Sequence, residues 1–422
     1  MENYFYRQLT NIREEGMRAV LRKARKLIMI PIVSPVVIIV RLIKPFILIR
    51  FGVLFQQRLG HFLINTELYL CERDVGLYAP AEHYVDIFGI GEKISNNQLM
   101  LMWRRILNIW PSWIINPIMI VNRALPFGDG HEIPPLLVSS GTARDTNNLL
   151  EVTETHLYFT DDEHTFGEKC LREMGIPEEA LFICLNVRDS AYLASNHQGI
   201  DWDYHNYRDT DINNYVLAAE ELAERGYYVI RMGEKVNKAL QSSNAKVIDY
   251  ATNGMRTDFM DIYLGAKCAF AISTGTGWDH VPNVFRRPLV YVNMCPIGGI
   301  GTSRKDFLVI SKHYWSKKGG REFTLSDIFN QGVGFFFNSS EYESKGIELI
   351  ENTPEEICDV CIEMVDRING KWQSQKDDEE LQKKFWDIFP RDAKNEAGIP
   401  FHGEIKSRFG SDFLRNNRWW LQ

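Results

Sequence analysis

Apolar residues form two alternating patterns along the first part of the chain. Compact apolar runs at residues 45–51 and 85–90 predict buried strands, whereas apolar residues at helical spacing predict helices over 61–71 and 97–110. Strands that alternate with helices form parallel sheets, because each helix returns the chain to the start of the next strand. We therefore expect residues 45–176 to form an N-terminal Rossmann-like domain.

The same alternation is clearer after Gly175-Ile176-Pro177, a turn-forming sequence that marks a boundary. It predicts a C-terminal Rossmann-like domain over residues 177–370, followed by a helical tail over 371–422. The expected elements of this domain are strands at 181–187, 227–232, 246–250, 268–273 and 288–294, and helices at 211–225, 258–267 and 354–369. The predicted fold is α/β, with two domains whose open parallel sheets face one another across a cleft.

Residues 1–44 differ from both domains, and we expect them to form a membrane-associating arm. Ten Lys/Arg against three Glu give residues 1–50 a net charge of +7, and Lys/Arg are dense at 18–26. The mostly apolar stretch at 27–40 is too short to cross a bilayer about 30 Å thick. A basic segment next to a short apolar one suits the anionic surface of a membrane, here bound through residues 18–44. A buried hairpin or an oligomer contact is the alternative.

Composition narrows the choice of partners and of compartment. The chain carries −7 in total, so residues 51–422 carry −14, and nucleic acid is not an expected partner of such an acidic body. The seven cysteines are scattered, odd in number and mostly within apolar runs. This favours reduced thiols over a disulfide framework, and hence the cytoplasm, with peripheral association at the inner face of the membrane.

A run of small residues predicts a phosphate-binding turn. Ser273, Thr274, Gly275, Thr276 and Gly277 stand between a predicted strand and a short predicted helix. Small residues at such a turn leave backbone N–H groups free to face an anion, and the helix dipole adds positive potential. In an open parallel sheet this turn lies at the carboxyl edge, where ligands bind. An ordinary tight connection is the alternative.

Two more strands of the C-terminal domain end in candidate ligand-binding residues. Arg188 and Asp189 follow one strand, and Arg231 and Gly233 stand at the end of the next. Because guanidinium groups form bidentate contacts with phosphate oxygens, we expect Arg188 and Arg231 to bind a diphosphate. Arg231 could instead pair with a buried carboxylate.

Two loops complete this edge of the sheet. A loop of about twenty residues follows Asp189, longer than most strand-to-helix connections, and longer loops are usually functional or disordered. Its side chains suit a polar, ring-shaped substrate, and those we single out are Tyr204, His205, Tyr207 and Arg208. A solvated excursion is the alternative. The other is the Gly-rich loop at 296–307, which carries Arg304 and Lys305. Together, the loop that begins at Arg188, the strand end at Arg231, the turn at 273–277 and this Gly-rich loop predict a site for a nucleotide diphosphate.

The N-terminal domain offers a candidate base at its first strand-to-helix junction. Arg58, Gly60 and His61 stand there, and an acceptor hydroxyl bound there would need a group to take its proton. Imidazole has a suitable pKa for this, so His61 is one candidate. Asp189 is the other, because a carboxylate beside Arg188 stays ionised at neutral pH. The alternatives are a helix-capping or core histidine and an Arg–Asp structural pair.

Four segments resemble a family of known proteins. They read RFGxLxxxRLGHFxxNTELYL at 50–70, CLNVRDSAYL at 184–193, NYRDTDINNY at 206–215 and YYVIRMG at 227–233. They are similar to a bacterial family of glycosyltransferases found among surface-polysaccharide and lipopolysaccharide genes. This resemblance implies the GT-B fold, with the sugar nucleotide on the C-terminal domain and no obligatory metal. More distantly, the turn at 58–61 resembles that of fucosyltransferase-like enzymes, although their doubled arginine is absent at Arg188.

The expected activity is transfer of a sugar from a nucleotide-diphosphate donor to a hydroxyl of a lipid-linked or surface-glycan acceptor. The diphosphate would rest on Arg188, Arg231 and the turn at 273–277, with no cofactor and no metal. The paired glutamates that many retaining GT-B enzymes carry are absent, which favours inversion. A sugar-nucleotide epimerase of similar fold and a non-catalytic membrane-associated scaffold are the alternatives.

Overall fold

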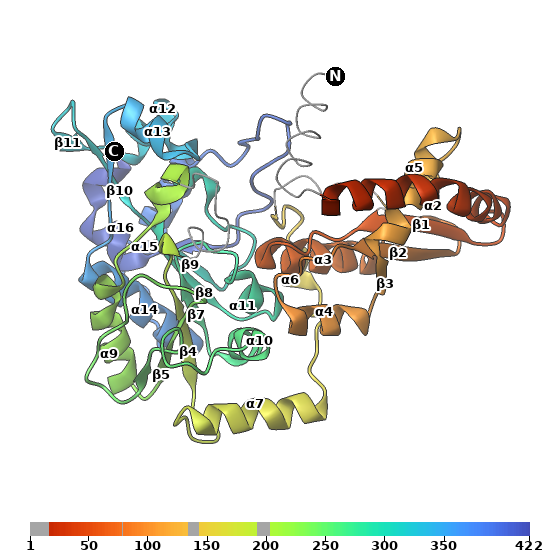
Figure 1. The fold of residues 1–422 in the computed structure, drawn as a ribbon. Helices are drawn as coiled ribbons and strands as arrows, with labels where there is room; N and C mark the ends of the chain where they lie inside the picture. Colours follow the sequence, from red (N-terminus) through yellow and green to blue (C-terminus); the bar gives the residue numbers. More distant parts are fainter. Residues whose placement is uncertain (1–16, 78, 134–142, 192–202) are drawn as a thin grey trace. The chain divides into compact units, whose positions relative to one another are not determined.

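The computed structural model of the protein describes residues 17–77, 79–133, 143–191 and 203–422. The chain divides into two compact units, unit 1 (Met1–Ala143) and unit 2 (Arg144–Gln422). Each unit is α/β and contains a parallel sheet (Figure 1). The expectation of an α/β protein with parallel sheets is confirmed.

Unit 1 is built on a three-stranded parallel sheet in the order β1-β2-β3. Its strands and crossover helices are β1 (Leu48–Val53), α3 (Leu59–Asp74), β2 (Tyr84–Ile90), α4 (Asn97–Arg104) and β3 (Asn108–Pro111). Arg50 of β1 forms a buried ion pair with Asp86 of β2, with Nε 2.7 Å from Oδ1. The hydroxyl of Tyr69 on α3 donates a hydrogen bond to the same carboxylate. This cluster therefore joins two strands to the helix that covers them.

The other face of this sheet is covered by α5 (Ser112–Ala124) and α2 (Met17–Leu42) (Figure 1). The buried cluster there contains Val33, Val37 and Val40 of α2, Phe51 of β1, and Ile115, Ile118, Met119 and Val121 of α5. The expectation of a separate arm over residues 1–44 therefore needs correction, because α2 contributes to the core of unit 1. Among the residues that the structure describes, no helix is both long and apolar enough to cross a bilayer.

One predicted helix of unit 1 ends earlier than expected. α4 ends at Arg104, where the N–H groups of Ile106 and Leu107 both turn back to the carbonyl of Trp103. Residues 108–110, expected in this helix, instead begin β3 and pair with β2. Backbone hydrogen bonds to the edge of β2 override the helical spacing of the apolar residues there.

Unit 2 is built on a seven-stranded sheet in the order β13-β9-β8-β7-β4-β5-β6, in which every neighbouring pair is parallel. The strands are β4 (Phe182–Asn186), β5 (Tyr228–Met232), β6 (Val247–Ile248), β7 (Ala271–Ser273), β8 (Leu289–Met294), β9 (Phe307–Ser311) and β13 (Arg408–Phe409). The first five lie where strands were expected, whereas β9 and β13 were not predicted.

Helices cover both faces of this sheet (Figure 1). On one face α9 (Val216–Glu224) packs against α14 (Pro354–Ile368), and on the other α10 (Asp258–Lys267) packs against α11 (His280–Val284). A smaller antiparallel sheet has the order β11-β10-β12. Its strands are β10 (His313–Ser316), β11 (Arg321–Glu322) and β12 (Ile347–Ile350), and the short helices α12 (Leu325–Asn330) and α13 (Ser339–Ser344) lie between β11 and β12 in sequence.

Residues 144–176 belong to unit 2, so the division lies after Ala143 rather than after residue 176 as expected. This segment contains α6 (Leu149–Val152) and α7 (Asp161–Glu173), which begins with a capping box of Thr160 and Glu163. The ring of Phe159 lies 5.2 Å from that of Tyr263 on α10, and Arg286 Nε donates to the carbonyl of Thr153 at 3.0 Å. These contacts fix the segment to the second sheet.

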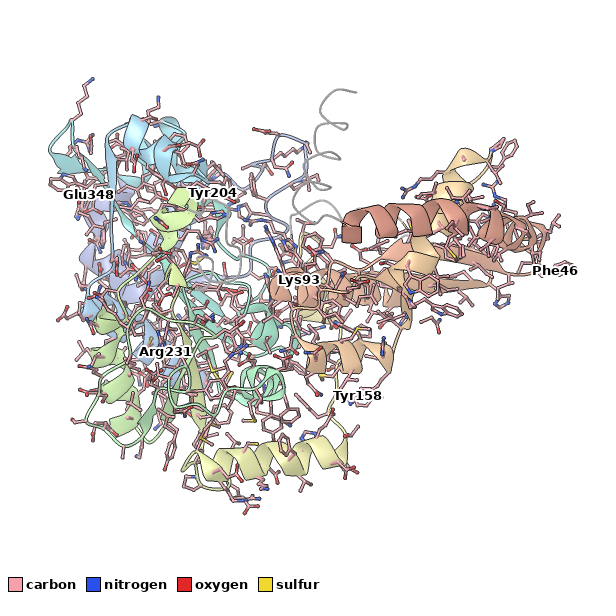
Figure 2. All side chains as sticks on the ribbon, in the orientation of Figure 1. Phe46, Lys93, Tyr158, Tyr204, Arg231 and Glu348 are labelled. Carbon is pink, nitrogen blue, oxygen red and sulfur yellow. The ribbon has the colours of Figure 1, made fainter. Side chains whose placement is uncertain are left out.

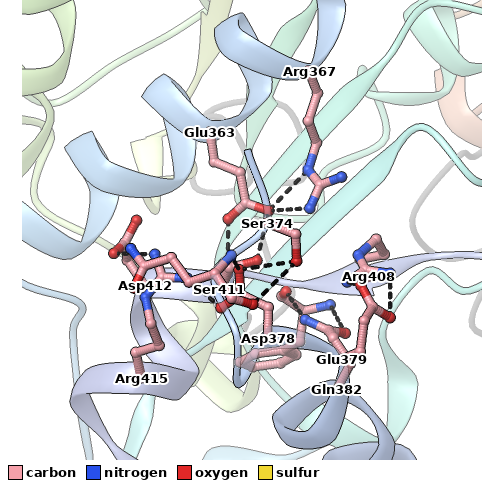
Figure 3. Close-up of polar contacts among 12 residues, drawn as sticks. Glu363, Arg367, Ser374, Asp378, Glu379, Gln382, Arg408, Ser411, Asp412 and Arg415 are labelled. Atoms are coloured by element: carbon pink, nitrogen blue, oxygen red, sulfur yellow. Dashed lines mark hydrogen bonds and ion pairs between the residues drawn. The ribbon is translucent and has the colours of Figure 1, made fainter. Parts of the chain in front are cut away.

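Residues 371–422, expected as a helical tail, also belong to unit 2. They contain α15 (Asp378–Ile388), α16 (Ser411–Asn416) and β13, which pairs with β9. Figure 3 shows the polar contacts that hold them. The buried carboxylate of Glu363 on α14 accepts from Ser411 N at 2.7 Å, and Gln382 Oε1 accepts from Phe409 N at 3.1 Å. Residues 371–422 therefore pack as part of unit 2 and add one short edge strand, β13, to its sheet.

Candidate functional site

The strand order of unit 2 reverses between β4 and β7. The chain passes from β4 to β5 on one side and from β7 to β8 on the other. Ligands of open α/β sheets bind outside the carboxyl ends of the strands at such a reversal. The segments that follow these two strands are Arg188-Asp189 and the turn at 273–277, so topology brings two of the predicted loops together.

Three cationic side chains gather at this edge, and we call Arg188, Arg208 and Lys312 the cationic cluster. Arg188 Nε lies 3.1 Å from the Asp209 carboxylate, and Lys312 Nζ donates to the Asp209 carbonyl at 2.7 Å. Burial and then the charge of Arg208 lower the pKa of Arg188. Burial also lowers the pKa of Lys312, which is only 4% exposed.

The carboxylate within the cluster is itself poorly solvated. Burial raises the pKa of Asp209 above its ordinary value, although Arg188 and Lys312 act in the opposite direction. Among the described residues, Asp209 forms the ion pair with Arg188, while Glu351 acts on Lys312 and the charge of Arg208 acts on Asp279. Three cations are thus held close to one another at a buried sheet edge, an arrangement that favours binding of a further anion.

Two of the N–H groups that we expected to be free in the turn at 273–277 instead donate to side chains within or beside the turn. Gly275 N donates to Ser273 Oγ at 3.2 Å, and Thr276 N donates to the carboxylate of Asp279 at 2.9 Å. Ser273 Oγ donates to the same carboxylate at 3.1 Å. The side chains of Ser273 and Asp279 therefore each accept from one backbone N–H group that was expected to face a phosphate.

This turn instead positions the arginines of the cationic cluster. Thr274 Oγ1 accepts from Arg188 N at 3.0 Å, and the Gly275 carbonyl accepts from the Arg208 guanidinium. Gly275 has φ +76°, a conformation that L side chains rarely adopt, so glycine suits the position at which this carbonyl is presented. Gly277 follows Thr276 and ends this turn.

Arg231 lies in β5 and forms an ion pair with a carboxylate. This is the alternative that we considered to its binding a diphosphate. Its side chain is only 1% exposed, and Nη1 lies 3.2 Å from Asp249 Oδ1. In Figure 2 it lies in the body of unit 2, apart from Tyr204. Gly233, with φ +153°, follows in the chain, and a Cβ there would lie 2.8 Å from Val236. Arg231 therefore supports the sheet rather than the cationic cluster.

Asp189 has a structural role in its loop. Its Oδ1 accepts from Ala191 N at 2.9 Å, and its Oδ2 accepts from Asn237 N at 2.8 Å. Both carboxylate oxygens therefore already accept backbone hydrogen bonds.

The loop after Asp189 re-enters the described residues at a short 3-10 helix, η2 (Asp203–Arg208). The rings of Tyr204 and His205 lie 3.9 Å apart, and the mostly buried Tyr207 lies 5.5 Å from Tyr342. Burial raises the pKa of Tyr207 to about 12, so its hydroxyl stays protonated. Residues 192–202 of the loop lie outside the described part of the chain.

The Gly-rich loop at 296–307 keeps its cations for structural pairs. Arg304 is buried and forms an ion pair with Asp306, and Lys305 Nζ lies 3.3 Å from Glu151 Oε1. Neither joins the cationic cluster. The fourth loop of the expected diphosphate site therefore supplies no cation to it.

The candidates of the N-terminal domain lie together in unit 1, at the start of α3. Arg58 is the exposed N-cap residue, and Gly60 is buried. His61 Nδ1 lies 3.5 Å from Asn65 Nδ2, and its ring meets that of Phe55 edge-on at 4.9 Å. His61 is thus a half-buried helix residue with polar and aromatic neighbours.

Sequence reasoning missed Asp209, Asp279 and Lys312. Asp209 stands in the NYRDTD segment beside Arg208, and Asp279 stands six residues after Ser273. Lys312 comes directly after β9, whose apolar run at 307–310 was a usable signal for another parallel strand. A strand at that position would have placed Lys312 at the same edge.

No family model matches this sequence, and no curated protein matches it. Solved structures do match at low identity. ADP-heptose lipopolysaccharide heptosyltransferase II of E. coli is 13% identical, with 62% of this chain and 90% of that chain covered and a TM-score of 0.35. A glycosyl transferase of family 9 from Veillonella parvula is 10% identical, with 78% and 99% covered and a TM-score of 0.42.

A structure assigned as a UDP-N-acetylglucosamine 2-epimerase from Listeria monocytogenes is 9% identical, with 76% of this chain and 97% of that chain covered and a TM-score of 0.28. Identities of 9–13% with these TM-scores do not separate a transferase from an epimerase. The function must be inferred from this chain's own residues.

Proposed function

We propose that this chain is a glycosyltransferase that binds the diphosphate of a nucleotide-sugar donor at the cationic cluster of unit 2. One observation carries the proposal: Arg188 and Lys312 both bind Asp209, through its carboxylate and its backbone carbonyl respectively, and the charge of Arg208 acts on Arg188. They do so where the strand order reverses, which is the usual ligand position in such a sheet.

The chemistry of a diphosphate suits this cluster. Burial and then the charge of Arg208 lower the pKa of Arg188, so this guanidinium is kept charged at a cost that a bound anion would reduce. As the glycosidic bond breaks, negative charge develops on the leaving diphosphate. Two guanidinium groups and an ammonium held in place would stabilise this charge without a metal ion, and no cofactor is proposed.

The remaining parts of the proposal concern fold, acceptor and base. Two α/β units with parallel sheets are consistent with the GT-B fold that the sequence resemblance implies. The acceptor would be a lipid-linked or surface-glycan hydroxyl at the cytoplasmic face of the membrane, and transfer would invert the anomeric centre. Since both oxygens of Asp189 accept backbone hydrogen bonds, His61 is the preferred base.

Nucleotide binding tests the proposal directly. Arg188→Gln and Arg208→Gln should each weaken the binding of a nucleoside diphosphate by roughly 10- to 100-fold, because each removes a charge-assisted hydrogen bond worth about 1.5–3 kcal/mol. Calorimetric titration with UDP, GDP and ADP measures the effect. Product analysis with a sugar nucleotide alone then separates an epimerase, which would convert it, from a transferase.

Arg225→Gln is the matched control, because this arginine forms a surface pair with Glu221 on α9. It should leave nucleotide binding unchanged. Wild-type binding in both Arg188→Gln and Arg208→Gln, with folding intact, would exclude the diphosphate site. A pH–rate profile of His61→Gln that matches the wild-type profile would remove His61 as the base.

A further inference from the structure

Helix α2 of unit 1 is apolar on two faces, and only one of them is covered. The inner face carries Val33, Val37 and Val40, which lie in the core of unit 1. The outer residues follow helical spacing and are 44–70% exposed; they are Ile28, Ile32, Val36, Ile39 and Leu42. A surface helix normally carries polar residues on its outer face, so this second stripe calls for a partner.

The apolar surface continues beyond the C-terminal end of α2. Phe46 is 83% exposed and projects from the turn after the helix (Figure 2), and Phe127 is 93% exposed. Phe127 also has φ +63°, an unfavourable conformation for a bulky residue. Neither ring is buried, so neither is explained by packing within unit 1.

Arg41 connects this end of α2 to the segment that carries Phe127. Its guanidinium donates to the carbonyl of Asn122 at 2.7 Å, to that of Leu125 at 3.3 Å and to that of Pro126. Asn122 lies on α5, and the other two carbonyls follow it in the chain. Arg41 thus holds the segment before Phe127 beside the end of α2, the end from which Phe46 also follows in the chain.

Charge decides what covers this surface. Residues 1–50 carry +7, whereas residues 51–422 carry −14, and five Lys/Arg at 18–26 precede the exposed stripe along the same helix. Two copies joined through this surface would bring two such charges together, which is unfavourable. An anionic lipid surface offers apolar depth together with opposite charge.

We propose that the outer face of α2, together with Phe46 and Phe127, lies on an anionic membrane surface. We call these residues the docking face. Phe46 and Phe127 enter the boundary between headgroups and acyl chains, and the positive charge that the sequence carries at 18–26 favours an anionic lipid over a neutral one. This inference does not depend on the proposed function, because lipid binding needs no donor.

The inner face of α2 determines how the proposal must be tested. Deletion of residues 1–44 would remove Val33, Val37 and Val40 from the core and expose Phe51 and Ile118. Such a protein is expected to misfold, so its loss of lipid binding would mean little. Substitutions confined to the exposed residues avoid this problem.

The experiment is co-sedimentation of the full chain with vesicles, without donor. Vesicles of phosphatidylcholine alone are compared with vesicles containing equal parts of phosphatidylcholine and phosphatidylglycerol. Wild-type protein should bind the anionic vesicles and lose binding at high salt. Phe46→Ser combined with Phe127→Ser should lower the partition coefficient by about tenfold per phenylalanine, since each substitution removes one large apolar side chain.

Two further variants complete the design. Ile32→Asn combined with Ile39→Asn tests the helix stripe independently of the phenylalanines, and thermal unfolding checks that each variant is folded. Phe166→Ser is the matched control, because this phenylalanine is 48% exposed but lies in unit 2, and it should bind vesicles as wild type does.

Three outcomes would overturn the proposal. The first is wild-type protein that binds neutral and anionic vesicles equally or binds neither. The second is undiminished binding by folded variants of the docking face. The third is a wild-type dimer in sedimentation velocity that these variants dissociate, which would assign the face to a second copy of the chain.

Discussion

The buried carboxylate of Asp279 shows how a single residue determines the chemistry of the turn at 273–277. It accepts hydrogen bonds from the Ser273 hydroxyl at 3.1 Å and from Thr276 N at 2.9 Å. Burial raises its pKa to about 7, although both hydrogen bonds act to lower it. The group therefore titrates near neutral pH, unlike an exposed aspartate.

Asp279→Asn should change how stability depends on pH. Between its ordinary pKa of 3.8 and about 7, the folded wild type holds a proton that the unfolded chain releases, so stability falls as pH rises through this range. Asparagine does not titrate. Between pH 4 and pH 8 the free energy of unfolding of the variant should therefore rise relative to that of wild type, by on the order of 3 kcal/mol. Urea unfolding at several pH values measures this difference. A constant difference across this range would show that Asp279 is ionised throughout.

At this scale the sequence located two cations of the cationic cluster, Arg188 and Arg208, but neither Lys312 nor the partners of these side chains. Arg188 and Arg231 both stand at strand ends, yet only Arg188 joins the cationic cluster, while Arg231 pairs with Asp249. The difference depends on where a distant carboxylate lies after folding. Strand order determines that position, and periodicity in one sequence does not reveal it.

A single histidine joins three elements of unit 2. His313 on β10 lies 2.6 Å from Glu322 on β11 and 3.0 Å from Glu356 on α14. Burial alone would lower its pKa, but the hydrogen bonds to both glutamates outweigh burial and raise it to about 9. His313 is therefore charged at neutral pH and connects the small sheet to the helix.

His313→Gln should remove a pH-dependent part of the stability of unit 2. The raised pKa means that this contribution is fully present below pH 6.5 and is lost as pH rises through about 9. At pH 6 the variant should be less stable by on the order of 3 kcal/mol, and the difference should shrink towards pH 10. Denaturant unfolding measures both values. His83→Gln, at an exposed position in unit 1, is the control, and an equal loss at both pH values would rule out the charged form.

Elements with a clear pattern were predictable, and those formed by pairing at a sheet edge were not. Thr160 and Thr353 are the N-cap residues of α7 and α14, and the capping boxes that they form are visible in the sequence. β3 and β13 are short strands that exist because a neighbouring edge supplies backbone partners. Such strands carry little signal of their own, since pairing rather than composition defines them.

At the scale of the whole molecule, the division after Ala143 assigns residues 144–176 to the second sheet. The turn-forming residues at 175–177 suggested a later boundary, because they do interrupt the chain between α7 and β4. A local turn is not a domain boundary when the segments on its two sides pack against each other. Phe159 and Arg286 provide that packing here.

Two fragments distinguish these boundaries. Residues 144–422 should unfold cooperatively, whereas residues 177–422 should be less stable by roughly several kcal/mol, because Tyr263 and Phe285 lose the ring of Phe159 that packs against them. Thermal unfolding and size-exclusion chromatography compare the two. Equal melting temperatures would place the boundary after residue 176.

The pairing of β13 with β9 also affects how the chain is made. β9 passes through the ribosome well before Arg408 and Phe409, so this edge of β9 has no β13 to pair with until those residues are synthesised. An unpaired edge can recruit a foreign strand, and a nascent chain halted at this stage would be prone to aggregate. Completion of the sheet therefore depends on residues that are synthesised long after β9.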